Sequence, residues 1–358
     1  MKNVIVLVIP TIQQGGAERV MSELANEFSK QNQEVHLVLL AQSNDFYFIN
    51  PSVKIYHLGF INKGGIKKIE AETKTFLNLR KILKTIKPDV VLSFMDKYNV
   101  FTILASRFLS LNVFVSDRSN PKKQIPQHIS ILKKLTYKFA TGIVAQTSLA
   151  KEILAKTTKN KNIKVIPNPV KQVKLFPEKK REKVILNVGR LVPEKGQKYL
   201  IEAFSKMEVS DWKMVILGDG PLRNDLIQQA KDLNIEEKLF LPGAVTTVDE
   251  WLAKASVFAF TSVSEGFPNA LVEAMSAGLP CISFDCDAGP RDIIKNGENG
   301  FLVPLKNTEE FSKRTQYLIE HPELRLAMGS KASAIKDELE ISKIAKEYLN
   351  FFASNQDK

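Results

Sequence analysis

Residues 184–207 read VILNVGRLVPEKGQKYLIEAFSKM and contain three successive patterns. An apolar run that suits a buried strand leads into a loop with glycine, and then into a segment whose apolar residues recur at helical spacing. Residues 4–28, VIVLVIPTIQQGGAERVMSELANEF, show the same order at the start of the chain. Two halves that both open with strand, glycine loop and amphipathic helix predict two domains built on parallel sheets.

Apolar, β-branched runs continue to alternate with helical patterns through both halves, as expected for parallel strands joined by crossover helices. We expect strands at 4–9, 35–40, 90–94, 113–115, 142–145 and 164–166, and again at 184–188, 214–217, 239–241, 257–260 and 281–283. A linker near residue 170 separates the halves. The prediction is an α/β protein with two Rossmann-like, doubly wound domains, 1–170 and 171–340, facing a cleft where ligands bind at the carboxyl ends of the strands.

Composition and charge restrict the class of protein. A chain of 358 residues with 44% hydrophobic content can form two cores. Its two cysteines, Cys281 and Cys286, imply no disulfide framework and suit a reducing cytoplasm, and the first apolar run is too short to span a bilayer. The net charge of +12 is uneven: residues 1–176 hold 27 Lys and Arg against 11 Asp and Glu, net +16, and the remainder holds 24 against 28, net −4.

The basic half predicts an anionic partner. Lysines and apolar residues at helical spacing in 63–87 and 122–138 fit surface helices that rest on anionic lipid head groups, or equally ordinary helices packed on their own sheet. A nucleic-acid-binding protein would also be basic. We expect no nucleic-acid partner, because zinc spacing, a stacking motif and a recognition-helix pattern are missing from the sequence.

Three glycine loops follow expected strands and carry groups that suit a diphosphate. Gly15 and Gly16 precede a helix and would let backbone N–H groups approach a phosphate, although a plain tight turn explains them equally well. Arg190 and Lys195 place a guanidinium and an ammonium at the end of the sheet where a ligand would lie. Gly218 suits either a close backbone approach or a simple strand-to-helix turn.

Residues 264–275, SEGFPNALVEAM, place two carboxylates eight positions apart around the start of a short helix. Pro268 suits the first helical position, which leaves Glu265 in the preceding loop and Glu273 on the helix. The stretch also supplies backbone N–H groups at the same edge, from Gly266, Phe267 and Asn269. One carboxylate can accept hydrogen bonds from a sugar and the other from a ribose, so that cations and carboxylates together predict a nucleotide-sugar site.

SEGFPNALVE resembles the E-x7-E motif of retaining family 4 glycosyltransferases of the GT-B fold. GGAER, GRLVPEKG, GDGPLR and NGENGFLVP stand in that family's order, and the resemblance covers essentially the whole chain. It implies that Arg190 and Lys195 bind the donor diphosphate, that Glu265 holds the transferred sugar and that Glu273 holds the ribose. The donor site implied in full is Gly15, Gly16, Arg190, Lys195, Gly218, Glu265, Gly266, Phe267, Pro268, Asn269 and Glu273. The resemblance further implies that residues 341–358 contain a last helix that crosses back onto the first domain.

Residues 115–121, VSDRSNP, are similar to the S-E-R-N-D-P loop of a bacterial subgroup that builds surface polysaccharides and lipid-linked oligosaccharides. Many members of the family carry a histidine near this loop, facing the donor sugar. This chain has Asp117 and Arg118 instead, and they join Glu265, Arg190 and Lys195 as candidate catalytic residues. Alternatively, Asp117 and Ser119 only cap a turn.

Asp285 and Asp287 match the D-x-D pattern that holds a divalent metal in another glycosyltransferase fold, but no histidine accompanies them. We expect no metal and no other cofactor, because members of the family rely on cations and helix N-termini to neutralise the leaving group.

The sequence therefore predicts a retaining, metal-independent glycosyltransferase. We expect it to move a hexose or N-acetylhexosamine from a nucleotide sugar, UDP-linked, to a lipid-linked saccharide acceptor in surface polysaccharide or glycan biosynthesis. Its expected place is the cytoplasm, as a monomer peripheral on the anionic inner face of the plasma membrane. A sugar-nucleotide epimerase or a phosphorylase of the same fold remains the alternative.

Overall fold

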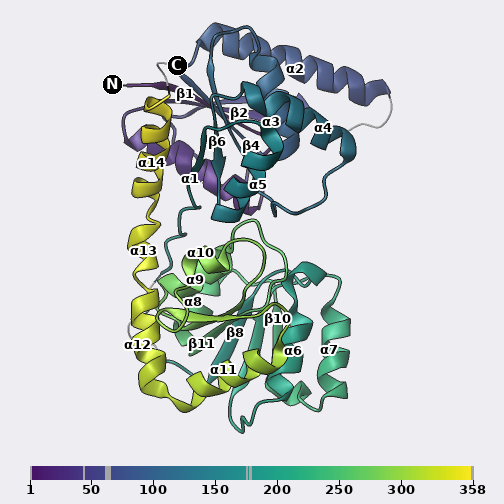
Figure 1. Cartoon of the computed structure of the whole chain (residues 1–358), viewed down its shortest axis with the longest axis vertical. Coiled ribbons are helices and arrows are strands. Elements are labelled where there is room, and N and C mark those ends of the chain that lie inside the picture. The colour runs from purple at the N-terminus through teal and green to yellow at the C-terminus, as the bar shows by residue number, and fades with distance from the viewer. Residues whose placement is uncertain (1, 43–44, 61–65, 175, 177–179, 356–358) are drawn as a thin grey trace. The chain divides into compact units, whose positions relative to one another are not determined.

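The computed structural model describes residues 2–42, 45–60, 66–174, 176 and 180–355, with backbone alone for residues 60 and 66–68. The chain forms two compact units. Unit 1 consists of Met1–Pro169 together with Glu340–Lys358, and unit 2 consists of Val170–Leu339. Each unit has its own parallel sheet (Figure 1). Each also has its own hydrophobic core.

A parallel sheet of seven strands in the order β3-β2-β1-β4-β5-β6-β7 forms the centre of unit 1. The strands are β1 (Val4–Ile9), β2 (Glu34–Ala41), β3 (Lys54–Phe60), β4 (Val90–Phe94), β5 (Asn112–Ser116), β6 (Gly142–Ala145) and β7 (Ile163–Val165). Because β1 pairs with β2 on one side and β4 on the other, the strand order reverses between β1 and β4. The carboxyl ends of β1 and β4 therefore mark the position where such sheets bind ligands.

The helices of unit 1 bury apolar residues against this sheet. They are α1 (Gly16–Lys30), α2 (Ile66–Ile86), α3 (Asp96–Ser106), α4 (Gln127–Thr136), α5 (Ser148–Thr158) and α14 (Ile341–Ala353), with a 3-10 turn η1 (Tyr137–Phe139). The last helix, α14, lies beside α1 (Figure 1), and the ring centroid of Phe28 is 6.4 Å from that of Tyr348 and 6.2 Å from that of Phe352. The end of the chain thus completes the core of the unit that its beginning forms.

Unit 2 has a parallel sheet of six strands in the order β10-β9-β8-β11-β12-β13. The strands are β8 (Val184–Val188), β9 (Lys213–Leu217), β10 (Leu239–Gly243), β11 (Val257–Phe260), β12 (Cys281–Phe284) and β13 (Gly300–Val303). The helices are α6 (Gln197–Ser205), α7 (Arg223–Asp232), α8 (Val248–Lys254), α9 (Asn269–Ser276), α10 (Pro290–Ile293), α11 (Thr308–Glu320), α12 (Pro322–Ala332) and α13 (Ile335–Glu338), with 3-10 turns η2 (Pro193–Lys195) and η3 (Glu236–Lys238). The order reverses between β8 and β11, so the ligand position of this sheet lies at their carboxyl ends.

The prediction of two doubly wound α/β sheets is confirmed, with corrections in detail. Strands β3 and β13 were not expected, and both lie at an edge of their sheet. Pro268 is the residue before α9 rather than its first helical residue, because the helix begins at Asn269. Among the described residues, no helix combines the length and the apolar character needed to cross a bilayer.

Candidate active site

In unit 2, the loops that follow β8 and β11 are joined at the point where the strand order reverses. Gly196 has φ +63°, and a side chain there would place its Cβ 2.2 Å from the carbonyl oxygen of Thr261. The backbone N–H of Val263 donates to the carbonyl oxygen of Glu194 at 2.8 Å. Because only glycine allows this close approach, the residues carried by the two loops are held side by side.

Lys195 and Glu265 meet at this junction. The Nζ atom of Lys195 lies 2.5 Å from Oε1 of Glu265, and the side chains are 23% and 9% exposed. The carboxylate holds the ammonium at the end of the sheet and supplies its counter-charge. A ligand phosphate could take over that pairing, since an ammonium has three N–H donors on a flexible stem.

Arg190 lies on the same loop but has different surroundings. Its side chain is exposed, and within the described part of the chain its guanidinium has no hydrogen-bond or ion-pair partner. The backbone is fixed, because Nε2 of the buried Gln197 donates to the Arg190 carbonyl at 3.0 Å. Sequence reasoning missed Gln197, since a polar first residue of a helix has no distinctive pattern. Arg190 is thus a cation on a rigid loop with its fork of donors available.

Gly218 packs against the same loop from β9. It has φ +142°, and a Cβ there would lie 2.0 Å from the carbonyl oxygen of Gly189. Gly220 has φ +158° and a similar approach to Leu191. These glycines let the loops after β8 and β9 lie in contact, which is a structural reason for GDGPLR that does not require a ligand.

The remaining candidate donor residues surround the start of α9. Glu265 and Gly266 lie in the loop before the helix, the buried Phe267 and Pro268 lead into it, and Asn269 is its first residue. Glu273 lies one turn further on and is half-buried. The helix is fixed by burial of Leu271, Val272, Ala274 and Met275. The structure therefore brings Arg190, Lys195, Gly218 and the 265–273 stretch together at one edge of one sheet.

The loop after β12 packs behind Glu265. Burial raises the pKa of the Cys286 thiol to about 12, and the negative charge of Glu265 contributes to this shift. Gly289 has φ +103°, and a Cβ there would meet Pro268 at 2.3 Å. Asp285 forms a bidentate ion pair with Arg291, and across the described ranges no cluster of three or more His, Cys, Asp or Glu side chains could hold a metal ion.

In unit 1, Gly15 and Gly16 lie after β1, beside the end of β4. Gly15 precedes α1 in an extended conformation, and Gly16 is the first residue of that helix. The Tyr47 hydroxyl donates to the Gly15 carbonyl at 3.0 Å. Burial raises the pKa of Glu18, in the first turn of the helix. The two glycines therefore lie at the position where the order of this sheet reverses, as expected of a ligand-facing loop.

Asp117 is held by a polar cluster that the sequence did not reveal. Its Oδ1 accepts hydrogen bonds from Tyr137 at 2.6 Å and Asn99 at 3.1 Å, and its Oδ2 pairs with Lys133. Lys133 also lies 2.5 Å from Oδ1 of Asp96. Burial raises the pKa of Asp117, and the lysine opposes that shift. The partners come from other elements, so no local pattern could identify them.

Arg118 also makes its side-chain contacts within unit 1, through its two terminal nitrogens. Its guanidinium donates to Asn168 at 2.6 Å and to the Tyr348 hydroxyl at 2.7 Å, and its Cζ lies 3.5 Å from the ring centroid of Phe94. Asp117 and Arg118 thus hold the loop after β5 in place. The alternative, that Asp117 and Ser119 cap a turn, is not the role seen here, because the Ser119 hydroxyl donates to Asp96 and the Asp117 side chain binds the cluster.

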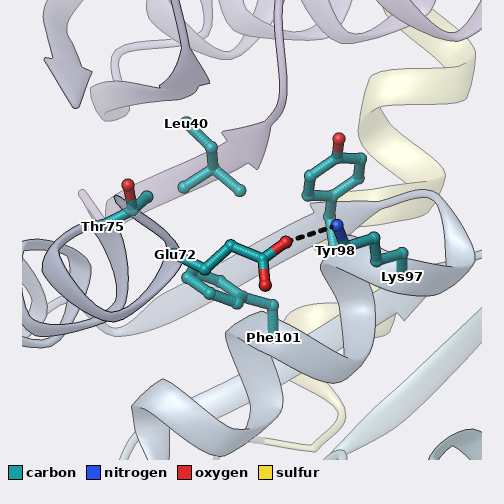
Figure 2. A pocket seen from close by; sticks show the side chains of 6 residues that line it. All are labelled: Leu40, Glu72, Thr75, Lys97, Tyr98 and Phe101. Atoms are coloured by element: carbon teal, nitrogen blue, oxygen red, sulfur yellow. Dashed lines mark hydrogen bonds and ion pairs between the residues drawn. The ribbon is translucent and has the colours of Figure 1, made fainter. Parts of the chain in front are cut away.

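Unit 1 has a small hollow at the end of β2 (Figure 2). It encloses about 270 Å³, counting the open space at its mouth, and is lined by Leu40, Glu72, Thr75, Lys97, Tyr98 and Phe101. Lys97 and Glu72 form an ion pair of 2.9 Å at the hollow (Figure 2). None of these side chains is among the predicted site residues, so the hollow is not assigned as an acceptor site.

Two doubly wound α/β sheets, each with a ligand position where its strand order reverses, are the architecture of glycosyltransferases of the GT-B fold. The Glycosyltransferase Family 4 model matches residues 14–172, and the Glycosyl transferases group 1 model matches residues 171–334. The chain belongs to this family of retaining glycosyltransferases.

Three known proteins illustrate what the chain is similar to. The Campylobacter jejuni GalNAc-alpha-(1->4)-GalNAc-alpha-(1->3)-diNAcBac-PP-undecaprenol alpha-1,4-N-acetyl-D-galactosaminyltransferase is 29% identical over 353 residues, 97% of each chain. The Escherichia coli UDP-Gal:alpha-D-GlcNAc-diphosphoundecaprenol alpha-1,3-galactosyltransferase is 30% identical over 266 residues, 67% of this chain and 68% of that one. HepE of Anabaena, solved in complex with UDP, has a TM-score of 0.80 at 19% identity over 99% of this chain and 100% of that one.

Proposed function

We propose that this glycosyltransferase moves a hexose or an N-acetylhexosamine from a UDP-linked sugar to a lipid-linked saccharide in surface polysaccharide or glycan biosynthesis. One observation carries the donor part: Lys195 and Glu265 are paired where the strand order of the unit 2 sheet reverses, and the available guanidinium of Arg190 lies on the same loop as Lys195. Cations beside a carboxylate match a diphosphate beside the hydroxyls of a sugar.

Each residue has a distinct role in this proposal. Arg190 and Lys195 neutralise the charge that develops on the leaving nucleoside diphosphate, and they stabilise the transition state more than the ground state. Glu265 accepts hydrogen bonds from the transferred sugar, and Glu273 accepts them from the ribose. In unit 2, the backbone N–H groups of Gly266 and Phe267 complete the donor site, with Pro268 shaping the turn. The N–H groups of Gly218 and Asn269 donate to the carbonyl oxygens of Gly243 and Phe267, so these two residues shape the site rather than bind the phosphate. In unit 1, the N–H of Gly15 donates to the Tyr47 hydroxyl, which leaves Gly16 as the glycine proposed to offer its N–H to a phosphate. Asp117 and Arg118 act as positioning residues, because their side chains are engaged within unit 1. The reaction needs no metal in this proposal.

The acceptor and donor identities are supported by the names of the relatives. The Campylobacter and Escherichia enzymes act on saccharides carried by undecaprenol diphosphate, and the Escherichia enzyme uses UDP-Gal. Unit 1, with its positive charge, is the proposed acceptor domain, since both an acceptor diphosphate and lipid head groups are anionic. The enzyme would then work in the cytoplasm as a monomer, peripheral on the inner face of the plasma membrane.

The test is transfer of labelled sugar from a panel of nucleotide sugars to a bacterial lipid extract. Wild type is compared with Glu265→Ala and Arg190→Ala, with Lys231→Ala on the exposed face of α7 as the matched control. Label in the lipid fraction that is lost in both site variants and kept in the control supports the proposal and names the donor. Equal incorporation of label into lipid by wild type and all three variants would contradict the roles proposed for Glu265 and Arg190.

An epimerase or phosphorylase of the same fold is separated by the same assay. An epimerase would convert the nucleotide sugar without any acceptor, and a phosphorylase would require free phosphate. Incubation with nucleotide sugar alone, and then with phosphate, followed by analysis of the products distinguishes both activities from transfer to lipid.

A further inference from the structure

Helix α4 and the turn η1 that follows it present apolar side chains to the outside of unit 1. Ile131, Leu135 and Phe139 recur at four-residue spacing and are 52%, 54% and 45% exposed. Leu132 is exposed beside them, whereas the one buried side chain of α4 is that of Thr136. A helix that hid its apolar side in the core would show the opposite arrangement.

The apolar surface continues onto the end of α3, which contacts α4 (Figure 1). The guanidinium of Arg107 lies 3.9 Å from the ring centroid of Phe139 and 5.0 Å from that of Phe108. Phe108 is 88% exposed and has φ +63°, a conformation that costs a residue other than glycine about 1 kcal/mol. We call this surface the apolar patch: Leu104, Phe108, Ile131, Leu132, Leu135 and Phe139.

Positive charge predominates in the segment that carries the apolar patch. Residues 97–151 contain nine Lys and Arg, of which Lys97 pairs with Glu72 and Arg118 and Lys133 are bound inside unit 1, against one acidic residue, Asp117. That carboxylate is turned inward, where it pairs with Lys133. The exposed cations of the segment include Lys122, Lys123, Lys134 and Lys138. Apolar side chains ringed by lysines complement a surface that is anionic outside and apolar beneath.

Helix α2, the other basic segment, differs from α4. Its Leu79 and Leu83 are fully buried in the core of unit 1, so the stripe that fitted a lipid-facing helix instead packs on its own sheet. Lys74, Lys81 and Lys84 are exposed and can attract anions, while Lys63 and the side chains of Lys67 and Lys68 lie outside the described residues. Helix α2 therefore presents only positive charge to an anionic surface, whereas α4 presents positive charge together with exposed apolar side chains.

We propose that the apolar patch inserts into the boundary between head groups and acyl chains of an anionic bilayer, with the surrounding lysines on lipid phosphates. This inference rests on the proposed function and locates where unit 1 meets the membrane that carries its acceptor. Opposite sides of α4 serve the two tasks: Lys133 reaches inward to the ends of β4 and β5 through Asp96 and Asp117, and Ile131 and Leu135 face outward. A second copy of the chain is a poorer occupant, because it would bring two sets of lysines together.

The first experiment is binding of the full chain to vesicles of phosphatidylglycerol with phosphatidylethanolamine, and to vesicles of phosphatidylcholine alone. Wild type should prefer the anionic vesicles and lose affinity at high salt. Replacing both rings, Phe108→Ser with Phe139→Ser, should lower the partition coefficient at least about tenfold, and Lys134→Gln or Lys138→Gln should lower it about fivefold each. The control is Leu326→Ser, which replaces an exposed apolar residue on α12 of unit 2, and this variant should bind as wild type does.

A second measurement separates the patch from the proposed function. Transfer to a short-chain, water-soluble acceptor should be equal in wild type and the double serine variant, and transfer to acceptor embedded in vesicles should fall only in the variant. Sugar transfer by a protein that does not bind vesicles would contradict membrane insertion of the apolar patch and support the proposed function. Vesicle binding by a protein that transfers no sugar would support insertion of the apolar patch and contradict the proposed function. A wild-type dimer that the serine changes convert to a monomer would also overturn the proposal, since the patch would then join two copies.

Discussion

Substitution of Arg190 should reduce the activity of the protein without reducing its stability. Arg190→Ala removes an exposed side chain without a partner among the described residues, so the free energy of unfolding should stay within about 0.5 kcal/mol of wild type. Turnover should still fall by about 100-fold, as when one transition-state donor is lost. Urea unfolding and steady-state kinetics on the same preparation measure both quantities.

Glu265→Gln tests the ion pair between Glu265 and Lys195. It leaves the half-buried ammonium of Lys195 without its carboxylate, which should cost about 1 to 3 kcal/mol of stability as well as activity. Glu298→Gln, on an exposed loop of the same unit, is the control and should change neither. A Glu265→Gln protein as stable as wild type would show that the ion pair does not hold the loop.

Cys286 should give the protein a defined loss of stability at high pH. Its thiol titrates near pH 9 when unfolded and at about 12 when folded, so between these values the folded state binds the proton more tightly. The free energy of unfolding should therefore decrease as the pH rises through this range, by about 1 kcal/mol per pH unit from this group. Cys286→Ser should flatten that part of the profile. An unchanged slope would mean that the thiol is accessible to solvent.

The sequence placed the candidate cations and carboxylates at the ends of strands but did not reveal their partners. Glu265 and Lys195 were predicted as donor-site residues because each follows an apolar strand, where ligand-binding residues gather. The contacts of Asp117 and Arg118 could not, since Lys133, Tyr137, Asn168 and Tyr348 lie 16, 20, 50 and 230 residues away. Periodicity describes neighbours along one element, and these contacts join several elements.

Among the elements, the loops after β8 and β9 depend on glycine because their backbones touch. Gly218→Ala adds a Cβ that would lie 2.0 Å from the Gly189 carbonyl oxygen, at a strained φ, and should destabilise the protein by about 2 to 4 kcal/mol. Gly243→Ala is the control, since it also has positive φ but open space within 4 Å, and should cost about 1 kcal/mol. Urea midpoints compare the two. Equal losses would show that the loops can separate without cost.

Strands and helices differed in how well the sequence predicted them. Of the central strands, β1 is a continuous apolar run and β8 is apolar apart from Asn187, and both were predicted with their correct ends. Strand β3 mixes polar and apolar residues at an edge of its sheet, and β13 is four residues within a loop motif, so neither stands out. Helices α2 and α4 have similar patterns of lysine and apolar residues, but the apolar side is buried in α2 and exposed in α4. The pattern alone could not distinguish the two, because burial depends on which side of the helix packs on the sheet.

For the whole molecule, removal of residues 340–358 should unfold unit 1 and spare unit 2. The deletion takes away Tyr348 and Phe352, both fully buried, and exposes Phe28 and Phe114, a loss of several kcal/mol for each large side chain. Unit 2 has a core to which these residues do not belong. Limited proteolysis should cleave unit 1 of the truncated chain and leave unit 2 protected. A peptide of residues 340–358 should restore protection, and equal protection of both units without it would contradict the prediction.

The position of α14 in unit 1 also determines the order of events during synthesis. The strands of unit 1 leave the ribosome first, but the helix that covers Phe28 and Phe114 is translated about 170 residues after Pro169. At about 5 to 20 residues per second, the nascent unit waits roughly 10 to 30 s with that apolar surface uncovered. Unit 2 is complete before unit 1, although its sequence comes later. We expect chaperones to bind the exposed surface of unit 1 during this interval, and unit 1 can be complete only after α14 has been synthesised.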